Sequence, residues 1–510
     1  MNLSRRWFIG GAVSALAFGG CRMFSAPVGK YSSGKRKLSF GVISDVHIRY
    51  NSITHKVGTD FNQSGETLEK TLTWFRDQGV DAIVIAGDIA DYGIIAELQV
   101  VADAWNKVFP NNKAPDGRTV EKVFVAGNHD VEGFKYRSFD LSYWSSKEEL
   151  AKILLVTDFK KNWEKIFNEE YNDIYKKEIN GYTFIGQHWG KQGWGKNCKF
   201  DLIKPFMEEN KSKINTSLPF FYAQHPHPKN TCHGPNAWGA DTGITTEVLS
   251  NFSNAVAFSG HSHYPLSDND AIWQGGFTSI GTASLRYLSI NDESILGVKV
   301  PGSFENAKTV YNGVKSSEAF QYLADENKVM PGIDRYNVRQ GMLVQVFDDC
   351  MTIVRRDFVH ETIIGEEWVM PLSTAEGKPF AFTEHAKRLK APEFPKDAKV
   401  TVAKARGKNR GKKGVAPVEK DILAIDFPTA DATGINNLNH YEISVEAKDS
   451  SKNQLRRMVA ANVVNPGKKV KEFTLKIACD TLPKNTKYRF VIYPVSSFGQ
   501  KGKSIATDWI

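Results

Sequence analysis

The stretch VDAIVIAGDIAD, residues 80–91, decides how this chain is expected to fold. Its first half is an unbroken apolar run, which is typical of a strand buried on both faces, and its second half is polar. LSFGVISDVHI (38–48) and EKVFVAGNHD (121–130) have the same form. Apolar residues at helical spacing in 64–79 and 94–109 separate the three runs. This order predicts a β–α–β–α–β unit, a sheet with helical crossovers.

Two later apolar runs also end in polar residues, SLPFFYAQHPHP (217–228) and NAVAFSGHSHYP (254–265). In sheets of this kind the functional site lies at the carboxyl ends of the strands. We therefore expect the polar segments that follow the five strands, here called polar exits, to converge. One loop histidine is unremarkable, but five such exits in order are hard to explain as solvated loops. Carboxylates and imidazoles together suit Zn, Mn or Fe. The candidate side chains are Asp45, His47, Asp88, Asp91, Asn128, His129, Asp130, His225, His261 and His263.

The motifs DVH, GDIAD, GNHD, a lone histidine and GHSH resemble those of the calcineurin-like metallophosphoesterase superfamily, over residues ~38–290. The resemblance implies an α/β fold, a two-sheet β-sandwich flanked by helices, around two divalent metal ions. Mn, Fe and Zn all remain open as their identity. The resemblance implies that Asp88 bridges the two ions. It further implies ligands for the first metal in Asp45, His47 and His263, and for the second in Asn128, His225 and His261.

Three more residues receive roles from the same resemblance. His129 is expected to stabilise the phosphate or to protonate the leaving group, and Asp91 to hydrogen-bond its ring and fix the tautomer. Asp130 is expected behind the ligands, or as a structural cap on the segment that follows it. The implied reaction is attack on phosphorus by a hydroxide held between the two ions, because paired metals lower the pKa of bound water.

The expected substrate is a phosphodiester or a small phosphomonoester. Tyr92 stands where the protein Ser/Thr phosphatases of this superfamily carry an arginine, which argues against phosphoprotein substrates. We expect His227 on an exposed loop rather than in the lining of the site. Four side chains beside the fourth strand either pack in the core and loops, the reading that we favour, or form a wall for a base or sugar: Trp189, Trp194, His233 and Trp238. The alternative function is a catalytically silent or glycan-docked envelope binding protein with the same fold.

A chain of 510 residues with 41% apolar residues predicts two or three packed domains. We place the catalytic domain at 38–385, with helices and loops over 140–215 and strands in 270–385 that complete a second sheet layer. KAPEFPKDAKV (390–400) is typical of a linker. Alternating strands then fill 391–510, which resembles a fibronectin type III domain and predicts an all-β sandwich. Docking of this domain to a surface glycan is an open alternative.

Residues 1–30 are expected to be an export signal and tether. A twin arginine, Arg5 and Arg6, precedes a short apolar stretch, and this resembles the address read by the Tat export machinery. FGGC ends at Cys21 and resembles a lipidation site, whereas ALA (15–17) offers a rival cleavage site. The expected location is therefore the periplasm or outer envelope, with or without a lipid anchor in the membrane.

The formal net charge of +9 is modest for this length, and we expect no nucleic-acid partner. Six basic residues lie in KARGKNRGKK (404–413), which we expect to be a solvated loop between the first strands of the C-terminal domain rather than a lipid or polymer contact. Apart from Cys21 the chain has four cysteines. An exported protein permits a Cys198–Cys232 disulfide, but four unpaired thiols fit equally well.

Overall fold

The computed structural model describes residues 34–51, 56–57, 65–136, 159–190, 200–234, 237–289, 337–373, 377–408, 419–430, 438–449, 454–459, 463, 466 and 471–510. The expected export signal with Cys21 lies outside the described residues, as do Trp194 and Cys198. Among the helices of the described ranges, none has the length and apolar character needed to span a membrane.

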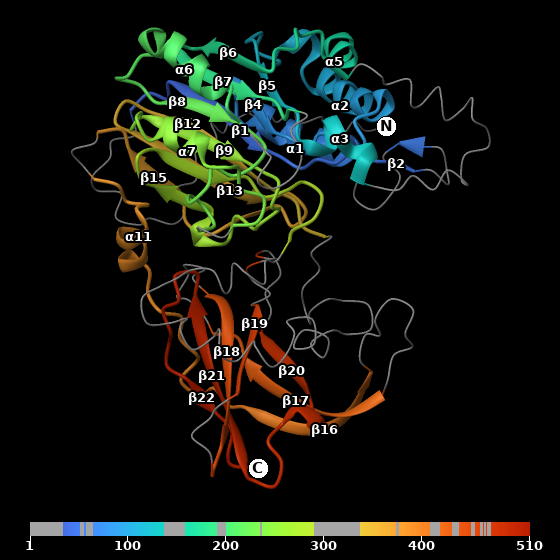
Figure 1. The fold of residues 1–510 in the computed structure, drawn as a ribbon, viewed down its shortest axis with the longest axis vertical. Coiled ribbons are helices and arrows are strands. Elements are labelled where there is room, and N and C mark those ends of the chain that lie inside the picture. Colours follow the sequence, from blue (N-terminus) through green and yellow to red (C-terminus); the bar gives the residue numbers. More distant parts are fainter. Residues whose placement is uncertain are drawn as a thin grey trace, which may run out of the picture. The chain divides into compact units, whose positions relative to one another are not determined.

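The first sheet is built on the strand that opens the catalytic domain. β1 (Leu38–Ile43), β4 (Ala82–Ala86) and β5 (Glu121–Val125) lie side by side and parallel. The helices α1 (Gly65–Asp77) and α2 (Ile95–Val108) connect them and cover one face of the sheet (Figure 1). The predicted β–α–β–α–β unit is confirmed.

The same sheet continues on the other side of β1. β12 (Gln340–Val346) pairs antiparallel with β1, and β13 (Cys350–Asp357) pairs with β12. The short strands β14 (Thr362–Ile363) and β15 (Trp368–Pro371) both pair with β13. The expectation that the strands of 270–385 complete a second layer was therefore wrong for these four strands, whereas the earlier β10 and β11 do belong to the second sheet. An apolar pattern marks a buried strand, but it does not say which sheet the strand joins.

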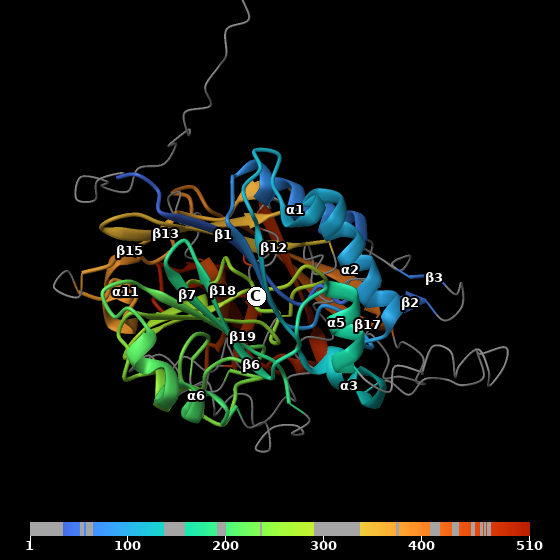
Figure 2. The same cartoon turned by 90° about the horizontal axis from the view of Figure 1, so that it is seen from above.

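The second sheet has the order β10-β11-β9-β8-β7-β6, and β8 and β9 within it are parallel. Its inner face packs on the first sheet through aromatic rings, since Phe40 lies 4.7 Å from Phe221 and 5.1 Å from Phe184 between ring centroids. Helices α6 (Ile203–Asn210) and α7 (Ile244–Leu249) pack on its outer face, and Figure 2 shows α6 and α2 on opposite sides of the strands. The strands are β6 (Ile174–Ile179), β7 (Tyr182–Gln187), β8 (Phe220–Ala223), β9 (Ala255–Ser259), β10 (Ile272–Gln274) and β11 (Thr278–Gly281).

The β6–β7 hairpin corrects the expectation of helices and loops over 140–215. Its two-residue turn is Asn180-Gly181, and both residues have positive φ, 51° and 82°. Asparagine followed by glycine is the preferred sequence of such a turn, so the signal was present in the sequence. Helix α5 (Phe159–Phe167) precedes the hairpin. The remaining elements of this domain are the hairpin of β2 (Tyr50–Asn51) and β3 (Lys56–Val57), with helices α3 (Asn128–Tyr136) and α11 (Phe382–Arg388).

The C-terminal domain consists of two antiparallel sheets, which confirms the all-β expectation, while the fibronectin resemblance stays a prediction. The sheets have the orders β16-β17-β20 and β19-β18-β21-β22. Phe427 of β17 and Tyr441 of β18 lie 5.0 Å apart between ring centroids, so the two sheets pack on each other. The strands are β16 (Thr401–Lys408), β17 (Glu419–Pro428), β18 (Leu438–Ala447), β19 (Gln454–Val459), β20 (Glu472–Ala478), β21 (Tyr488–Ser496) and β22 (Ile505–Ala506).

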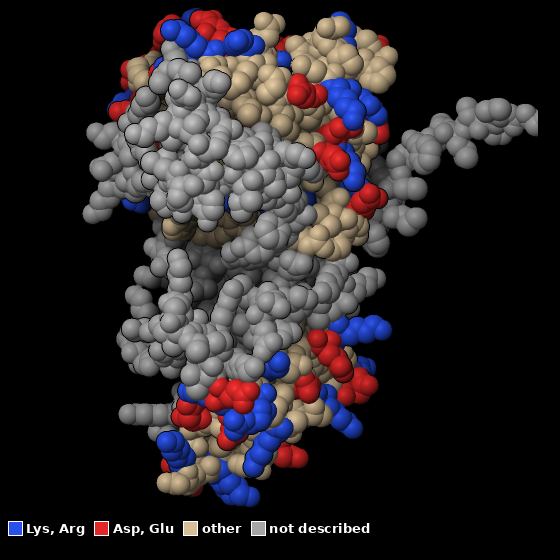
Figure 3. Space-filling model, turned by 90° about the vertical axis from the view of Figure 1, so that its right-hand side faces the viewer, with Lys and Arg blue, Asp and Glu red and all other residues tan. Residues whose placement is uncertain are grey.

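The basic run at 404–413 is a strand in its first part, because Lys404–Lys408 belong to β16. Arg406 pairs with Asp421 at 3.0 Å, and the residues after 408 lie outside the described part. On the face shown in Figure 3, basic and acidic side chains of the described residues are interspersed. Cys232 is a free, buried thiol, and Cys198 lies outside the described residues.

Candidate metal centre

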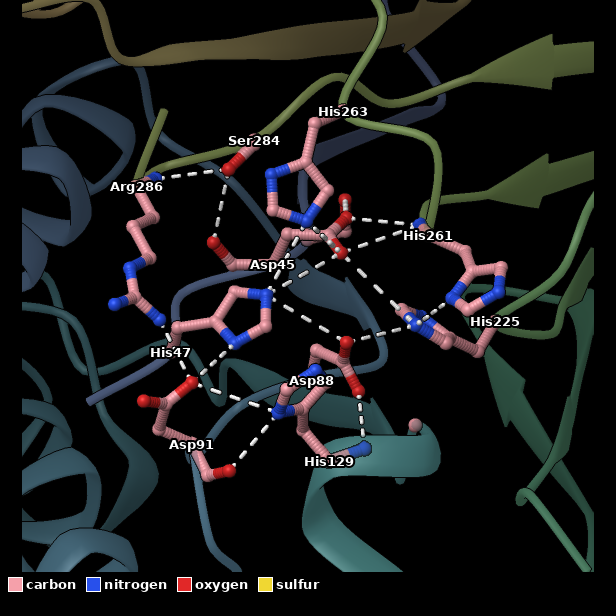
Figure 4. Close-up of polar contacts among 12 residues, drawn as sticks. Asp45, His47, Asp88, Asp91, His129, His225, His261, His263, Ser284 and Arg286 are labelled. Atoms are coloured by element: carbon pink, nitrogen blue, oxygen red, sulfur yellow. Dashed lines mark hydrogen bonds and ion pairs between the residues drawn. The ribbon is translucent and has the colours of Figure 1, made fainter. Parts of the chain in front are cut away.

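The polar exits of the strands converge at one end of the two sheets (Figure 4). Asp45 and His47 follow β1, Asp88 follows β4, and these three residues are at most 2% exposed. The exits of the second sheet supply three histidines that are at most 6% exposed: His225, His261 and His263. The convergence arises because β1, β4, β8 and β9 all end at this edge.

The first candidate group is Asp45, His47 and His263, whose ligand atoms lie within 4.8 Å of one another. Nε2 of His263 is 3.0 Å from Oδ1 of Asp45 and 3.2 Å from Nε2 of His47. Nδ1 of His47 lies 3.1 Å from the carboxylate of Asp91, and Nδ1 of His263 lies 3.0 Å from the carbonyl oxygen of Tyr287. When both Nδ1–H groups donate to these outer acceptors, the Nε2 lone pairs of His47 and His263 point toward the Asp45 carboxylate. A cation bound there would interact favourably with all three groups.

The second candidate group is Asp88, His225 and His261, again within 4.8 Å. Nε2 of His225 lies 3.0 Å from Oδ2 of Asp88, and Nδ1 of His225 lies 2.8 Å from the carbonyl of Ala86, which accepts its proton. Asn128 is 1% exposed, and neither atom of its amide has a hydrogen-bond partner within the described residues. A buried polar group without a partner is costly, and a cation bound by the amide oxygen would remove that cost.

Asp88 is a member of the second group and also lies close to the first. Its Oδ2 is 3.5 Å from Nε2 of His47 in the first group and 3.0 Å from Nε2 of His225 in the second. This is the position that a bridging carboxylate requires, although the bridging role itself stays a prediction. The residues present therefore fit two cations that share one carboxylate.

Five of the candidate ligands have backbone conformations that residues other than glycine rarely adopt. Positive φ angles of 49° to 72° occur at Asp45, His47, Asp88, His261 and His263. Each such residue costs about 1–3 kcal/mol and persists only where its surroundings fix it. The amides of Asp45 and His47 do this by donating to the carbonyls of Gly87 and Asp88, both at 2.9 Å.

Glycines in the motifs make room for the carboxylates. A Cβ at Gly127 would lie 2.2 Å from Oδ1 of Asp88, and one at Gly260 would lie 2.4 Å from Oδ2 of Asp45. Any other residue at either position would displace a candidate ligand. The glycines of GNHD and GHSH are thus explained by close packing.

Electrostatics in the centre favour a cation. Burial raises the pKa of Asp45, but His263 and His225 outweigh this and bring the pKa to about 2. Burial lowers the pKa of His225, but the Asp88 carboxylate outweighs it and raises the pKa to about 9. Burial, together with His225, lowers the pKa of His261 to about 3. The carboxylates of Asp45 and Asp88 thus favour a proton on His225, and a divalent cation can replace that proton.

His129 and Asp91 lie beside the first group. Nδ1 of His129 is 2.9 Å from the main-chain carbonyl of Asp91 and 3.5 Å from its carboxylate. The carboxylate itself is closer to Nδ1 of His47, at 3.1 Å. The carbonyl of Asp91 therefore fixes the tautomer of His129, and its carboxylate orients His47. His129 is 18% exposed at its side chain, so solvent reaches it more readily than the candidate ligands.

Asp130 fastens two strand exits together. Its buried carboxylate accepts hydrogen bonds from the amides of Gly127 at 2.7 Å, Ala90 at 2.7 Å and Ile89 at 3.1 Å. Burial and the nearby Asp88 raise the pKa of Asp130 to about 7. The side chain thus links the loop after β5 to the loop after β4, behind the candidate ligands.

Two arginines at the site were missed by the sequence analysis. Nη1 of Arg286 lies 2.7 Å from Oδ1 of Asp91, and Nε of Arg49 lies 3.3 Å from Oδ2 of the same carboxylate. Arg286 follows β11, which makes TSIGTASLRY (278–287) a sixth strand with a polar exit. That pattern was the available signal, but it belongs to no motif. Tyr92 lies next to this cluster, with its hydroxyl 3.4 Å from Arg49.

The aromatic and histidine side chains beside β8 divide into buried and exposed members. Trp189 and His233 are buried, as expected. His227 was expected on an exposed loop, and this was wrong, because it is 1% exposed and lies 2.6 Å from Oγ of Ser262. The polar residues around it accept and donate its hydrogen bonds, which allows burial. Trp238 is 53% exposed and stacks on His261.

Comparison with known proteins adds the following. Residues 38–265 match the family described as calcineurin-like phosphoesterase. Among solved structures, a conserved protein from Streptococcus pneumoniae TIGR4, named as a predicted phosphoesterase, is 13% identical, with 66% of this chain and 97% of that chain covered and a TM-score of 0.25. A purple acid phosphatase from yellow lupin (Lupinus luteus) seeds is 11% identical, with 66% and 53% covered and a TM-score of 0.38. No curated protein matches the chain.

Proposed function

Because residues 38–265 match the calcineurin-like phosphoesterase family, we propose that the protein is a metal-dependent hydrolase that cleaves a phosphodiester or a small phosphomonoester. One observation carries the proposal. The carboxylate of Asp88 lies within 3.5 Å of a histidine nitrogen in each of two groups of buried candidate ligands. A paired site of this kind suits in-line displacement at phosphorus.

The chain would hold two divalent ions, Mn, Fe or Zn, through the residues already described. Asp45, His47 and His263 would bind one ion, and Asn128, His225 and His261 the other, with Asp88 shared. Such ions supply Lewis acidity and lower the pKa of bound water. Asp45 and Asp88 supply the negative charge, and the outward hydrogen bonds from Nδ1 of His47, His225 and His263 keep these three rings in place.

His129 would act on the substrate directly. Its Nδ1 donates a hydrogen bond to the carbonyl of Asp91, and its Nε2 would face an ester or phosphate oxygen of the substrate. A protonated ring would donate from Nε2 to that oxygen and stabilise the charge that develops on it. Asp91 orients this ring and that of His47, which couples the proton donor to the first group.

The site of action is proposed to be the cell envelope. The twin arginine at 5–6 and the apolar stretch after it support export. Tat export of a folded chain would allow the centre to fill before export. Fractionation of cells that express the full chain, with and without an Arg5→Lys and Arg6→Lys pair of substitutions, tests this. Retention of only the variant in the cytoplasm is expected, whereas equal export of both would contradict the proposal.

The activity is tested by assaying the purified chain, loaded separately with Mn²⁺, Fe²⁺ and Zn²⁺. The substrates are bis-aryl phosphate, aryl phosphate, cyclic nucleotides and phospholipid head groups. Turnover of at least one class, lost on chelation and restored by the metal, is expected. If the folded protein carries two metal equivalents but hydrolyses none of these substrates, the result would contradict the proposal and favour a catalytically silent binding protein.

A further inference from the structure

Trp238 combines high exposure with direct contact to the candidate metal centre. It is the most exposed large apolar side chain in the described ranges, at 53%. Its ring nevertheless stacks on the imidazole of His261, with centroids 4.8 Å apart and planes inclined by 18°. One face of the indole thus covers a candidate ligand, while the side chain remains half open to solvent.

The backbone that follows Trp238 is held by hydrogen bonds to residues 227–229. The amide of His227 donates to the carbonyl of Gly239 at 3.2 Å, and the amide of Asp241 donates to the carbonyl of His227 at 2.8 Å. The Asp241 carboxylate accepts from the amide of Lys229 at 3.0 Å. Gly239 has a φ of 80°, and a Cβ there would lie 2.4 Å from Cδ2 of His261. The segment is therefore fitted closely against the imidazole.

A second tryptophan shows that Trp238 differs from an ordinary packing residue. Trp189 also lies against His261, at 5.7 Å between ring centroids, but it is only 3% exposed. Its Nε1 is buried and has no hydrogen-bond partner within the described ranges. His261 thus has one buried indole and one open indole as neighbours. An apolar side chain such as Trp189 is enough to bury the imidazole, so burial alone does not explain why a second aromatic ring lies there half exposed to water.

We propose that Trp238 is a stacking platform for the group esterified to the phosphate, so that the substrate is a phosphate ester that carries a planar ring, such as a nucleobase or an aryl group. This inference rests on the proposed function. A phosphate at the candidate centre would place its ester group next to His261 and hence beside the indole. Stacking on an aromatic face tolerates many rings, so it selects a class of substrate rather than one base.

The test compares two leaving groups of similar size, one planar and one puckered. Benzyl and cyclohexylmethyl esters are assayed as phosphomonoesters and as methyl phosphodiesters, with metal-loaded wild-type protein, Trp238→Ala and Trp238→Phe. Trp238→Ala is expected to lower kcat/KM for the benzyl esters about tenfold and to change that for the cyclohexylmethyl esters by less than about twofold. Trp238→Phe should keep part of the preference. Trp509→Ala is the control, because Trp509 is also exposed, at 37%, but lies in the C-terminal domain.

Metal content and ligand binding separate the possible outcomes. Equal losses with both leaving groups, or loss of bound metal in Trp238→Ala, would make Trp238 a cover for His261 and overturn the inference. Turnover without any benzyl preference in the wild-type protein would overturn it while leaving the proposed function intact. If no ester is hydrolysed, calorimetry decides. Tighter binding of benzylphosphonate than of cyclohexylmethylphosphonate, lost in Trp238→Ala, would support stacking, and equal binding would refute it.

Discussion

Oδ2 of Asp88 lies 3.0 Å from Nε2 of His225, although the two residues follow strands of different sheets. Asp88 comes after β4 in the first sheet, and His225 comes after β8 in the second. The contact therefore exists only when the two sheets have packed on each other. The candidate centre is in this sense a product of the whole sandwich, and its formation reports on correct packing.

Replacement of Asp88 tests the shared carboxylate. We expect Asp88→Asn to lower turnover by more than about 100-fold, beyond what loss of an outer hydrogen-bond partner causes, while the fold is retained. The amide has no negative charge to balance two cations. Activity, metal content and circular dichroism are measured on one sample. Undiminished activity in a folded variant with two metal equivalents would refute the bridging role.

Replacement of His129 separates chemistry from metal binding. His129→Ala should lower kcat by about 100- to 10,000-fold, which is the range of general acid–base catalysis, and should leave metal content close to that of the wild type. The reason is that His129 is a member of neither candidate group, and its Nδ1 donates a hydrogen bond to the carbonyl of Asp91. A fall in metal content as large as the fall in kcat would argue against a catalytic role.

Asp130→Asn should destabilise the catalytic domain by about 1–3 kcal/mol, because the new amide nitrogen cannot accept all of the hydrogen bonds from Gly127, Ala90 and Ile89. Urea unfolding measures the change. Asp116→Asn is the matched control, since the carboxylate of Asp116 is solvent-exposed and bonds to Arg118. The prediction fails if both variants unfold at the same urea concentration.

Acid should destabilise the fold through His188. This ring is 3% exposed, and burial lowers its pKa to about 3. Nδ1 of His188 accepts from the amide of Ala126 at 2.9 Å. Because an unfolded histidine has a pKa of about 6.5, the unfolded chain binds more protons between about pH 6.5 and 3. The stability from a neutral His188 is thus fully present above about pH 6.5 and is lost as the pH falls, by about 1.4 kcal/mol per unit.

The measurement is urea unfolding at several pH values from 7 to 4.5. A His188→Gln variant keeps an acceptor but cannot bind a proton in this range. Its free energy of unfolding should therefore fall less steeply with acidification than that of the wild type. Parallel curves for the two proteins would show that His188 is not the group responsible.

The sequence was sufficient for the parts of the site that follow from strand order. Parallel strands of one sheet end at the same edge, so Asp45, Asp88 and Asn128 could be placed together from the apolar runs before them, and His225 and His261 likewise in the second sheet. The glycines in these motifs were also informative, because a Cβ at Gly127 or Gly260 would collide with a candidate ligand. Local patterns thus predicted the convergence of side chains far apart in the chain.

Other features depend on contacts that a local pattern does not encode. The pairing of β12 with β1 joins ends of the domain, and an apolar strand carries no mark of its partner. Arg286 reaches Asp91 only through the course of the chain after β11. The stacking of Trp238 on His261 depends on the register between the segments at 227 and 239. The Asn180-Gly181 turn is different, because its signal was local and was overlooked.

Anomalous diffraction from crystals of the Mn²⁺-loaded protein tests the two-metal centre most directly. We expect two manganese peaks about 3.5–4 Å apart. One should be bounded by Asp45, His47 and His263, the other by Asn128, His225 and His261, with Asp88 in contact with both. A single peak, or peaks that do not touch Asp88, would contradict the account.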